Sequence, residues 1–218
     1  AAAARLKGIE TLEEFFGVDL AQRLADRGRQ ADLMVANNVL AHVPDINDFV
    51  KGFAILLKPH GVATFEFPHL MQLIEQKQFD TIYHEHFSYL SFRTVHQIFR
   101  TNGLSVFDVE ELDTHGGSLR VFAQRSDAGT QAVSGKVAHL LEREAAAGMN
   151  KAAYYRGFQE QANKVKNDFL VFLLEAARQG KTVAAYGAAA KGNTLLNYAG
   201  VRPDLLPYVV DKNPNKQG

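Results

Sequence analysis

The stretch ADLMVANNVLAHVPDINDFVKGFAILLKPHGVATFEFP, Ala31 to Pro68, decides the fold of this chain. It contains two near-continuous apolar runs of strand length, residues 31–38 and 62–67. Between them lies a segment with helical spacing, which Asp45 opens and which closes before Pro59. A strand, a helix and a second apolar strand in this order are typical of a parallel sheet covered by helices on both faces.

The segments on either side extend this pattern. A short strand is predicted at Lys7, and a helix from Val18 that stops at Gly28. Another helix is predicted over residues 91–103, followed by two strands that flank the turn sequence DTHGG. We therefore predict an α/β fold with a mostly parallel sheet. We expect strand 31–38 to lie beside strand 62–67. Strands 104–112 and 118–124 are expected to form a terminal antiparallel pair at an edge of the same sheet.

The composition changes near Ser126, and the rest of the chain follows another pattern. Residues 135–180 predict two helices with a break at the sequence AGMN, the second helix being long. A strand, a glycine-containing loop, a helix and a strand follow. We predict three parts: an N-terminally incomplete α/β domain at 1–126, a helical connector at 127–180, and the beginning of a Rossmann-like domain at 181–218. Both ends look cut, so a fragment of a longer protein is expected.

Composition excludes several classes of protein. Lys and Arg number 24, as do Asp and Glu, so no net field recruits nucleic acid or an anionic membrane. The absence of cysteine excludes disulfides, thiolate catalysis and cysteine-ligated metals in this chain, and it fits a cytoplasmic protein. No apolar run is long enough to span a bilayer. Partners must therefore be read from local sites.

The sequence YHEHFSY, Tyr83 to Tyr89, crowds groups that exchange protons near neutral pH. One interpretation is a catalytic site. The other is a polar junction between a loop and a helix capped by Ser91. A metal site built from these histidines and His42 or His69 ranks low, because the helical His-Glu-x-x-His spacing is missing.

A second polar group follows the first buried strand. Asn37, Asn38 and His42 come at its C-terminal end, where ligands of open α/β sheets bind. Asn38 could instead cap a helix, with His42 packed beneath it. The residues alone do not decide between these interpretations.

Five motifs together resemble a known enzyme family. They are LMVANNVLAHVPDINDFV, LLKPHGVATFEFPHL, YHEHFSYLS, DTHGGSLRVFA and YGAAAKGNTLLNYAG. In this order they resemble S-adenosylmethionine-dependent C-methyltransferases that act on nucleotide-linked 4-keto-6-deoxy sugars. The resemblance implies a class I methyltransferase domain and a C-terminal Rossmann-like domain that helps to hold the small-molecule nucleotide-sugar. It implies zinc only in an N-terminal domain that this chain lacks, and no metal in the chain itself. The oligomeric state stays open.

The chemistry that the family performs suits the crowded motif. Methylation of a ring carbon beside a ketone needs a base to remove a proton and a donor to stabilise the enolate oxygen. The resemblance implies a catalytic set in which His86 is the base, Tyr83 donates to the oxygen, Glu85 orients or tunes a neighbour, and His42 takes part.

Further residues are predicted to bind cofactor and substrate. Asn37 and Asn38 are predicted to reach the cofactor, and Phe15 and Phe16 to flank its adenine, although core packing is equally open for these two rings. The predicted substrate-binding residues are His84, His115, Ser118, Arg120, Tyr186, Gly187, Lys191, Asn193 and Asp211.

Two of these groups have a plain structural alternative. The loop YGAAAKGN could meet a phosphate through its amides and Lys191, with Asp211 as a ribose-binding acid, or it could be only a tight turn. Likewise HGGSLR could be a hairpin turn with a solvated Arg120. Two rival functions follow: an oxidoreductase that binds NAD(P) at this loop, and a non-catalytic module that binds sugar nucleotides.

Overall fold

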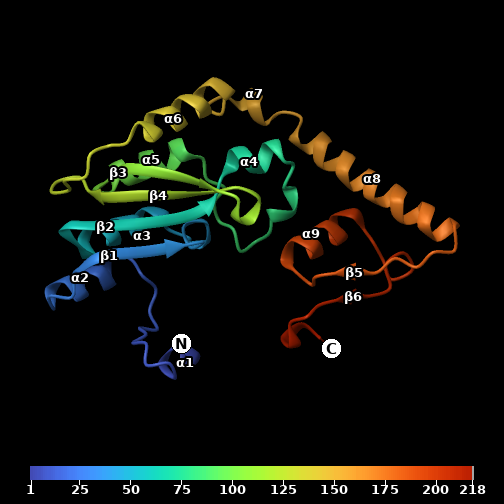
Figure 1. Cartoon of the computed structure of the whole chain (residues 1–218), viewed down its shortest axis with the longest axis horizontal. Coiled ribbons are helices and arrows are strands. Elements are labelled where there is room, and N and C mark those ends of the chain that lie inside the picture. Colours follow the sequence, from blue (N-terminus) through green and yellow to red (C-terminus); the bar gives the residue numbers. More distant parts are fainter. Residues whose placement is uncertain (218) are drawn as a thin grey trace. The chain divides into compact units, whose positions relative to one another are not determined.

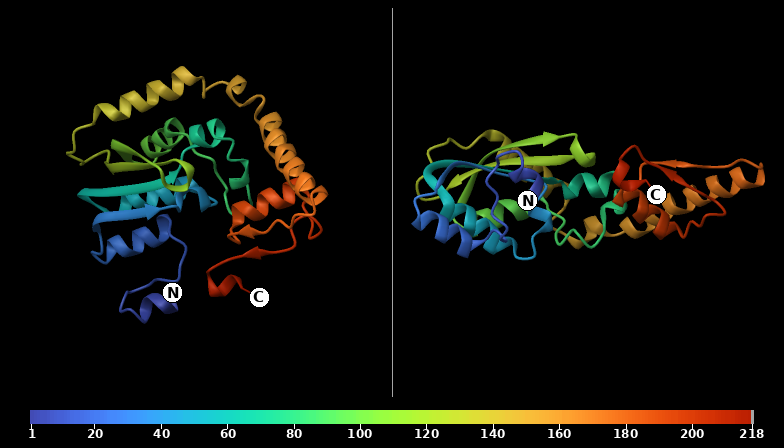
Figure 2. Two further views of the ribbon diagram at one scale, coloured as in Figure 1. Left: turned by 45° about the vertical axis from the view of Figure 1, so that its right-hand side comes forward. Right: turned by 90° about the horizontal axis from the view of Figure 1, so that it is seen from below.

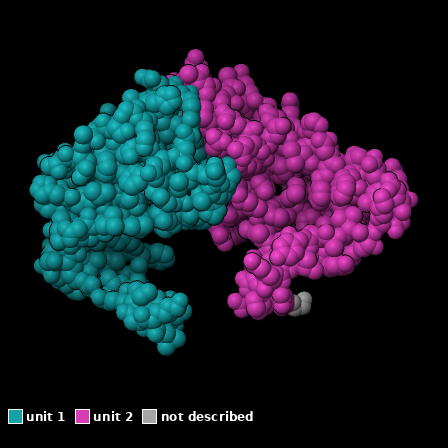
Figure 3. Space-filling view, viewed as in Figure 1, with its two compact units in different colours: residues 1–69, 87–144 teal, residues 70–86, 145–218 magenta. Residues whose placement is uncertain are grey.

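The computed structural model describes residues 1–217 and divides them into two compact units. Unit 1 comprises residues 1–69 and 87–144, and unit 2 comprises residues 70–86 and 145–217 (Figure 3). The chain therefore passes from unit 1 to unit 2 and back before its final crossing. The functional division predicted at residues 126 and 180 remains a prediction.

Unit 1 is built on a four-stranded sheet with the order β1-β2-β4-β3 (Figure 1). The strands are β1 (Ala31–Asn37), β2 (Leu57–Pro68), β3 (Leu104–Leu112) and β4 (Ser118–Arg125). β1 pairs with β2 in parallel, and β4 is antiparallel to both of its neighbours. Three strands thus run in one direction and only β4 runs against them. The prediction of an α/β fold with a mostly parallel sheet and a terminal antiparallel pair is confirmed, with β4 lying inside β3.

Aromatic side chains fill the space between this sheet and two helices. Phe53 of α3 (Ile46–Leu56) and Phe99 of α5 (Phe92–Thr101) each lie with their ring centroid 4.6 Å from that of Phe65 on β2. All three rings are buried. Both helices therefore cover the same face of the sheet, and burial of their apolar faces stabilises the unit.

The predicted helix starts are confirmed by their caps. The side chain of Asp45 accepts hydrogen bonds from the amides of Asn47 and Asp48, and that of Ser91 accepts one from Thr94. These bonds satisfy amides that have no partner within the helix. Helix α2 (Val18–Asp26) begins at the predicted residue and ends before Gly28, which has φ +70°.

Helices α2 and α3 approach closely at a glycine. A Cβ atom on Gly52 of α3 would lie 2.9 Å from the backbone carbonyl of Gly17, the residue before α2. That distance is shorter than any carbon contact that a packed interior tolerates. The glycine therefore permits the contact between these helices.

Two expectations about unit 1 are wrong. The strand predicted at Lys7 is absent: helix α1 (Ala2–Arg5) is followed by a turn in which Gly8 has φ +74°, and no strand within residues 1–217 pairs with this segment. The sheet is also not covered on both faces at β1, because Leu33 and Val35 are 60% and 58% exposed. Among residues 1–217 no helix covers these two side chains.

Unit 2 has long helices and a small sheet. It contains α4 (Leu70–Glu75), the 3₁₀ turn η2 (Phe79–Thr81), α7 (Ala152–Tyr155), α8 (Phe158–Arg178), β5 (Ala185–Tyr186), α9 (Ala190–Ala199), β6 (Val209–Val210) and the 3₁₀ turn η4 (Pro214–Lys216). β5 and β6 are parallel, and α9 packs beside α8 (Figure 2). The predicted break near AGMN is confirmed, since α6 (Gly135–Ala147) ends just before Gly148, which has φ +84°. No helix in the described residues is long and apolar enough to cross a membrane.

Candidate active site

The YHEH motif forms a turn that brings two of its rings together. The amide of His86 donates to the carbonyl of Tyr83 over 3.0 Å. The two rings stack with their centroids 4.5 Å apart and an interplanar angle of 30°. Tyr83 and His86 are half-buried, whereas His84 and Glu85 are exposed. The motif is thus a compact turn in unit 2 and not an extended strand.

A backbone carbonyl fixes the proton on the His86 ring. Nδ1 of His86 lies 2.8 Å from the carbonyl oxygen of Thr81, which can only accept a hydrogen bond. Nδ1 therefore carries a proton, and the neutral ring has its lone pair on Nε2. Thr81 is itself buried, and its hydroxyl donates to the carbonyl of Gln78 over 2.9 Å. This is the tautomer that a general base acting through Nε2 requires.

The surroundings of Tyr83 keep its hydroxyl protonated. Burial raises the pKa of Tyr83 above its usual value, and the negative charges of Glu85 and Asp80 raise it further. A protonated phenol can donate a hydrogen bond to an oxygen that becomes anionic. Glu85, although exposed, therefore acts on its neighbour through charge.

The motif segment packs against the C-terminal helix of its own unit. The ring of Phe79 lies 5.1 Å from that of Tyr198 at the end of α9. The hydroxyl of Tyr198 bonds to Asn163 and accepts from Nε2 of Gln159 on α8 over 2.7 Å. Phe79 is buried, so this contact anchors the segment that precedes Tyr83.

In unit 1, two of the predicted cofactor residues, Asn37 and Asn38, lie at the C-terminal end of β1. Asn37 pairs in register with Glu66, and the amide of Asn38 donates to the carbonyl of Glu66 over 2.7 Å. Asn38 adopts a left-handed conformation with φ +54°, a strained geometry that is common at functional sites. It does not cap a helix, because Val39 is the residue before the 3₁₀ turn η1 (Leu40–His42).

His42 closes that turn and is half-buried. The preceding residue, Ala41, accepts hydrogen bonds from the amides of Phe87 and Ser88 over 2.9 and 3.2 Å. Phe87 follows His86 directly in the sequence. The end of the motif is therefore tied to the residue before His42.

The predicted substrate-binding residues of the hairpin between β3 and β4 differ in burial and in contacts. His115 lies at the exposed tip, in the 3₁₀ turn η3 (Thr114–Gly116), with φ +56°. Ser118 is buried, and its hydroxyl donates to the carbonyl of Thr114 over 2.9 Å. Arg120 is not solvated alone: it contacts Glu66 at 3.0 Å and Glu110 at 3.6 Å.

Glu66 is a polar residue of this region that the sequence analysis missed. Its carboxylate is 6% exposed and accepts from Arg120 and, over 3.1 Å, from the hydroxyl of Thr114. The signal was a single glutamate within the apolar run VATFEFP. A charge in a buried strand is retained only where partners surround it.

The glycine loop of unit 2 is held by Asp211. Gly187 has φ +100° and donates its amide to Val210 over 2.7 Å. The carboxylate of Asp211 accepts from the amides of Asn213 and Ala188, both over 2.8 Å, and these bonds lower its pKa below the usual value. Asp211 thus stabilises the conformation of the glycine loop through its backbone amides.

A cavity of about 760 Å³ opens beside this loop. Its walls are mostly apolar, and they come from α8, β5, the glycine loop and α9. The residues that line it include Phe169, Phe172, Tyr186, Gly187, Asn193 and Leu196. Tyr186, Gly187 and Asn193 of the predicted substrate set thus share one cavity. Lys191 lies in the first turn of α9.

The two predicted adenine-flanking rings have different surroundings. Phe16 packs edge-to-face on Phe49 and Phe53, with centroid distances of 5.6 and 5.2 Å. Phe15 is fully exposed. Within residues 1–217 no group of three or more His, Asp or Glu side chains is arranged to hold a metal ion.

Two family models, one for each half, together match nearly the whole chain. Residues 4–109 match the methyltransferase domain, and residues 113–218 match the C-methyltransferase C-terminal domain. The C-methyltransferase NovU of Streptomyces niveus is 36% identical over all 218 residues. Both halves of the chain thus match methyltransferase families. The resemblance to C-methyltransferases that the sequence motifs carry is thereby confirmed, and with it the prediction of a methyltransferase domain.

The chain spans about half the length of this curated relative, 52% of it. Among solved structures, a possible histamine N-methyltransferase from Thermotoga maritima is 16% identical, with a TM-score of 0.43 over 58% of this chain and 69% of the other. A methyltransferase from Clostridium acetobutylicum is 10% identical, with a TM-score of 0.42 over 57% and 68%.

Proposed function

We propose that the whole protein transfers the methyl group of S-adenosylmethionine to a ring carbon of a nucleotide-linked 4-keto-6-deoxy sugar. The observation that carries this proposal is the Tyr83–His86 stack, with the His86 tautomer fixed by the carbonyl of Thr81. A base and a proton donor side by side suit proton removal from a carbon next to a ketone. The identity to a C-methyltransferase supports transfer to carbon.

The residues have distinct roles in this reaction. Nε2 of His86 takes the proton from the carbon, and the electrons of that C–H bond move into the carbonyl to give an enolate. The hydroxyl of Tyr83 donates to the enolate oxygen, an interaction that strengthens as the charge develops. The carbon then attacks the sulfonium methyl, the C–S bond breaks, and S-adenosylhomocysteine leaves. His86 later returns its proton to water. His42 is the next candidate for the base.

We further infer where the two substrates bind. Asn37 and Asn38 lie at the sheet edge that ligands of open α/β folds use, and they would hold S-adenosylmethionine there. The loop 186–193 and its cavity would hold the nucleotide, with Lys191 near its phosphates. The bonds from Asp211 to two backbone amides make it a support for this loop, and they weaken the case for a ribose contact and for NAD(P).

The proposal is tested with the full-length protein and a panel of nucleotide-linked keto sugars. Incubation with S-adenosylmethionine should yield a product heavier by one methylene group, with S-adenosylhomocysteine formed in equal amount. Methyl transfer to oxygen or nitrogen, or reduction of the ketone by NADPH, would contradict it. Binding of the sugar nucleotide without turnover would favour the non-catalytic module.

A further inference from the structure

A fully buried, hydrogen-bonded pair of side chains in unit 1 takes no part in the proposed chemistry. Nε2 of His69 lies 2.7 Å from Oε1 of Glu144, and each side chain is 1% exposed. Nδ1 of His69 has no hydrogen-bond partner among residues 1–217. The bond to Glu144 is therefore the ring's polar contact in this part of the chain. Buried charges are rare and persist where several bonds compensate them.

Glu144 also holds the start of helix α5. Its Oε1 accepts from the amide of Phe92 over 2.6 Å, and its Oε2 accepts from that of Arg93 over 2.8 Å. A negative charge is favoured at these first amides of a helix. Burial would raise the pKa of Glu144, but the bonds from His69, Arg93 and Phe92 together lower it below its usual value. Glu144 is therefore an ionised cap.

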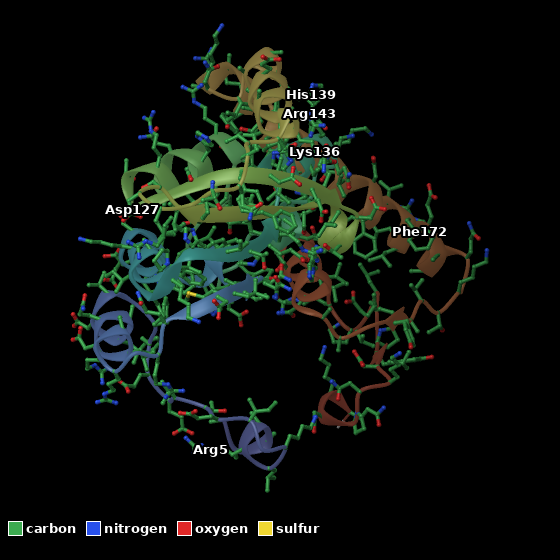
Figure 4. All side chains as sticks on the ribbon, turned by 60° about the vertical axis from the view of Figure 1, so that its left-hand side comes forward. Arg5, Asp127, Lys136, His139, Arg143 and Phe172 are labelled. Carbon is green, nitrogen blue, oxygen red and sulfur yellow. The ribbon has the colours of Figure 1, made fainter. Side chains whose placement is uncertain are left out.

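The helix that carries Glu144 is fixed on the sheet by an ion pair. Arg143 of α6 donates to the carboxylate of Glu111 on β3 through Nη1 and Nη2, over 2.8 and 2.5 Å. Val137 and Leu140 of the same helix are buried in the core of unit 1. Figure 4 shows Lys136, His139 and Arg143 along this helix, next to the strands β3 and β4. Glu144 thus projects from a rigid element.

The pair lies where the motif segment leaves and rejoins unit 1. His69 is the last residue before the excursion 70–86, which ends with the YHEH motif. On return, Leu90 forms a parallel bridge with His69, and the amides of Phe92 and Arg93 bind Glu144. One carboxylate therefore joins the chain before the excursion to the chain after it.

We propose that Glu144 and His69 are positioning residues that close the base of the motif-bearing excursion. The inference rests on the proposed function of the motif. Fixing both ends of a loop reduces the arrangements that it can adopt. Loss of one partner would remove a hydrogen bond that compensates the other buried group, and the two ends would be held less firmly. Displacement of catalytic groups by about 1 Å is enough to cost ~10²-fold in rate.

The first test compares three variants of the full-length enzyme. His69→Phe keeps the ring volume but cannot donate to Glu144, whereas His69→Gln retains a donor of similar reach. Glu142→Gln is the matched control, because Glu142 is exposed on the same helix. We expect His69→Phe to lower kcat by ~10–100-fold with little change in KM. His69→Gln should restore most of the rate, and Glu142→Gln should leave it unchanged.

The second test follows amide hydrogen exchange and needs no activity. In His69→Phe and in Glu144→Gln, amides of residues 79–93 should exchange at least ~10-fold faster, while those of β2 and β4 keep their protection. If the wild type fails to methylate any keto sugar, the proposed function fails. The amide exchange rates still test whether Glu144 and His69 hold the two ends of the excursion. Unchanged exchange in the motif contradicts the proposal. Loss of protection throughout the sheet in both variants also contradicts it, because the pair would then hold the whole domain.

Discussion

Replacement of His86 by asparagine removes the proposed base but keeps the hydrogen bond to the carbonyl of Thr81. The Nδ2 atom of asparagine occupies nearly the place of Nδ1 and can still donate to Thr81, whose carbonyl accepts from His86 over 2.8 Å. The atom that is lost is Nε2, the proposed base. We therefore expect His86→Asn to lower kcat for methyl transfer by ~10²–10⁴-fold, the usual contribution of general-base catalysis.

The same substitution should cost little stability. The stack on Tyr83 is lost, which removes about 0.5–1.5 kcal/mol. His86→Ala is the matched control, because it also leaves the carbonyl of the buried Thr81 without this donor and adds about 1–3 kcal/mol. Urea unfolding and steady-state kinetics on both variants separate the two effects. The reasoning is refuted if His86→Asn methylates at the wild-type rate, or if His86→Asn is destabilised as strongly as His86→Ala.

Four further outcomes are expected. Tyr83→Phe should lower kcat by ~10²–10³-fold with little change in sugar-nucleotide affinity. A rise in KM with kcat unchanged would exclude the oxyanion role. Lys191→Ala should weaken nucleotide-sugar binding in calorimetry more at low than at high salt, and equal affinity at both would refute a phosphate contact. Gly52→Ala should lower the urea midpoint by an amount equivalent to about 1–3 kcal/mol, because its Cβ would meet the backbone of Gly17. The pKa of Glu144 is lowered in the folded state, so the stability that its charge contributes is present above its unfolded pKa and is lost as the pH falls through its folded pKa. When unfolding is measured at a series of acidic pH values, the free energy of unfolding should therefore fall less steeply with decreasing pH in Glu144→Gln than in the wild type.

The elements that the sequence predicted depend on local signals. Asp45 and Ser91 cap their helices as expected, because a cap is decided within three or four residues. The apolar runs 31–38 and 62–67 became neighbouring parallel strands, as the local order of strand, helix and strand predicts. The predicted strand at Lys7 failed because a strand needs a partner, which a local pattern does not supply.

The parts that were missed depend on pairs distant in the chain. Glu66 and Arg120 meet because their positions are opposite each other in the register of β2 and β4. His69 and Glu144 are 75 residues apart and meet because α6 returns to the sheet. Within the motif, the sequence named Tyr83, Glu85 and His86. The turn that stacks Tyr83 on His86, and the carbonyl that fixes the tautomer, appear only in three dimensions.

The central claim is that His86 removes a proton from the carbon next to the ketone. It is tested most directly by incubating the full-length enzyme with the nucleotide-linked keto sugar in heavy water, without S-adenosylmethionine, and following one ring hydrogen by NMR. The account predicts that the wild type replaces that single hydrogen with deuterium and that His86→Asn exchanges it at least ~10²-fold more slowly. Exchange at the wild-type rate in His86→Asn would contradict the account and place the base elsewhere.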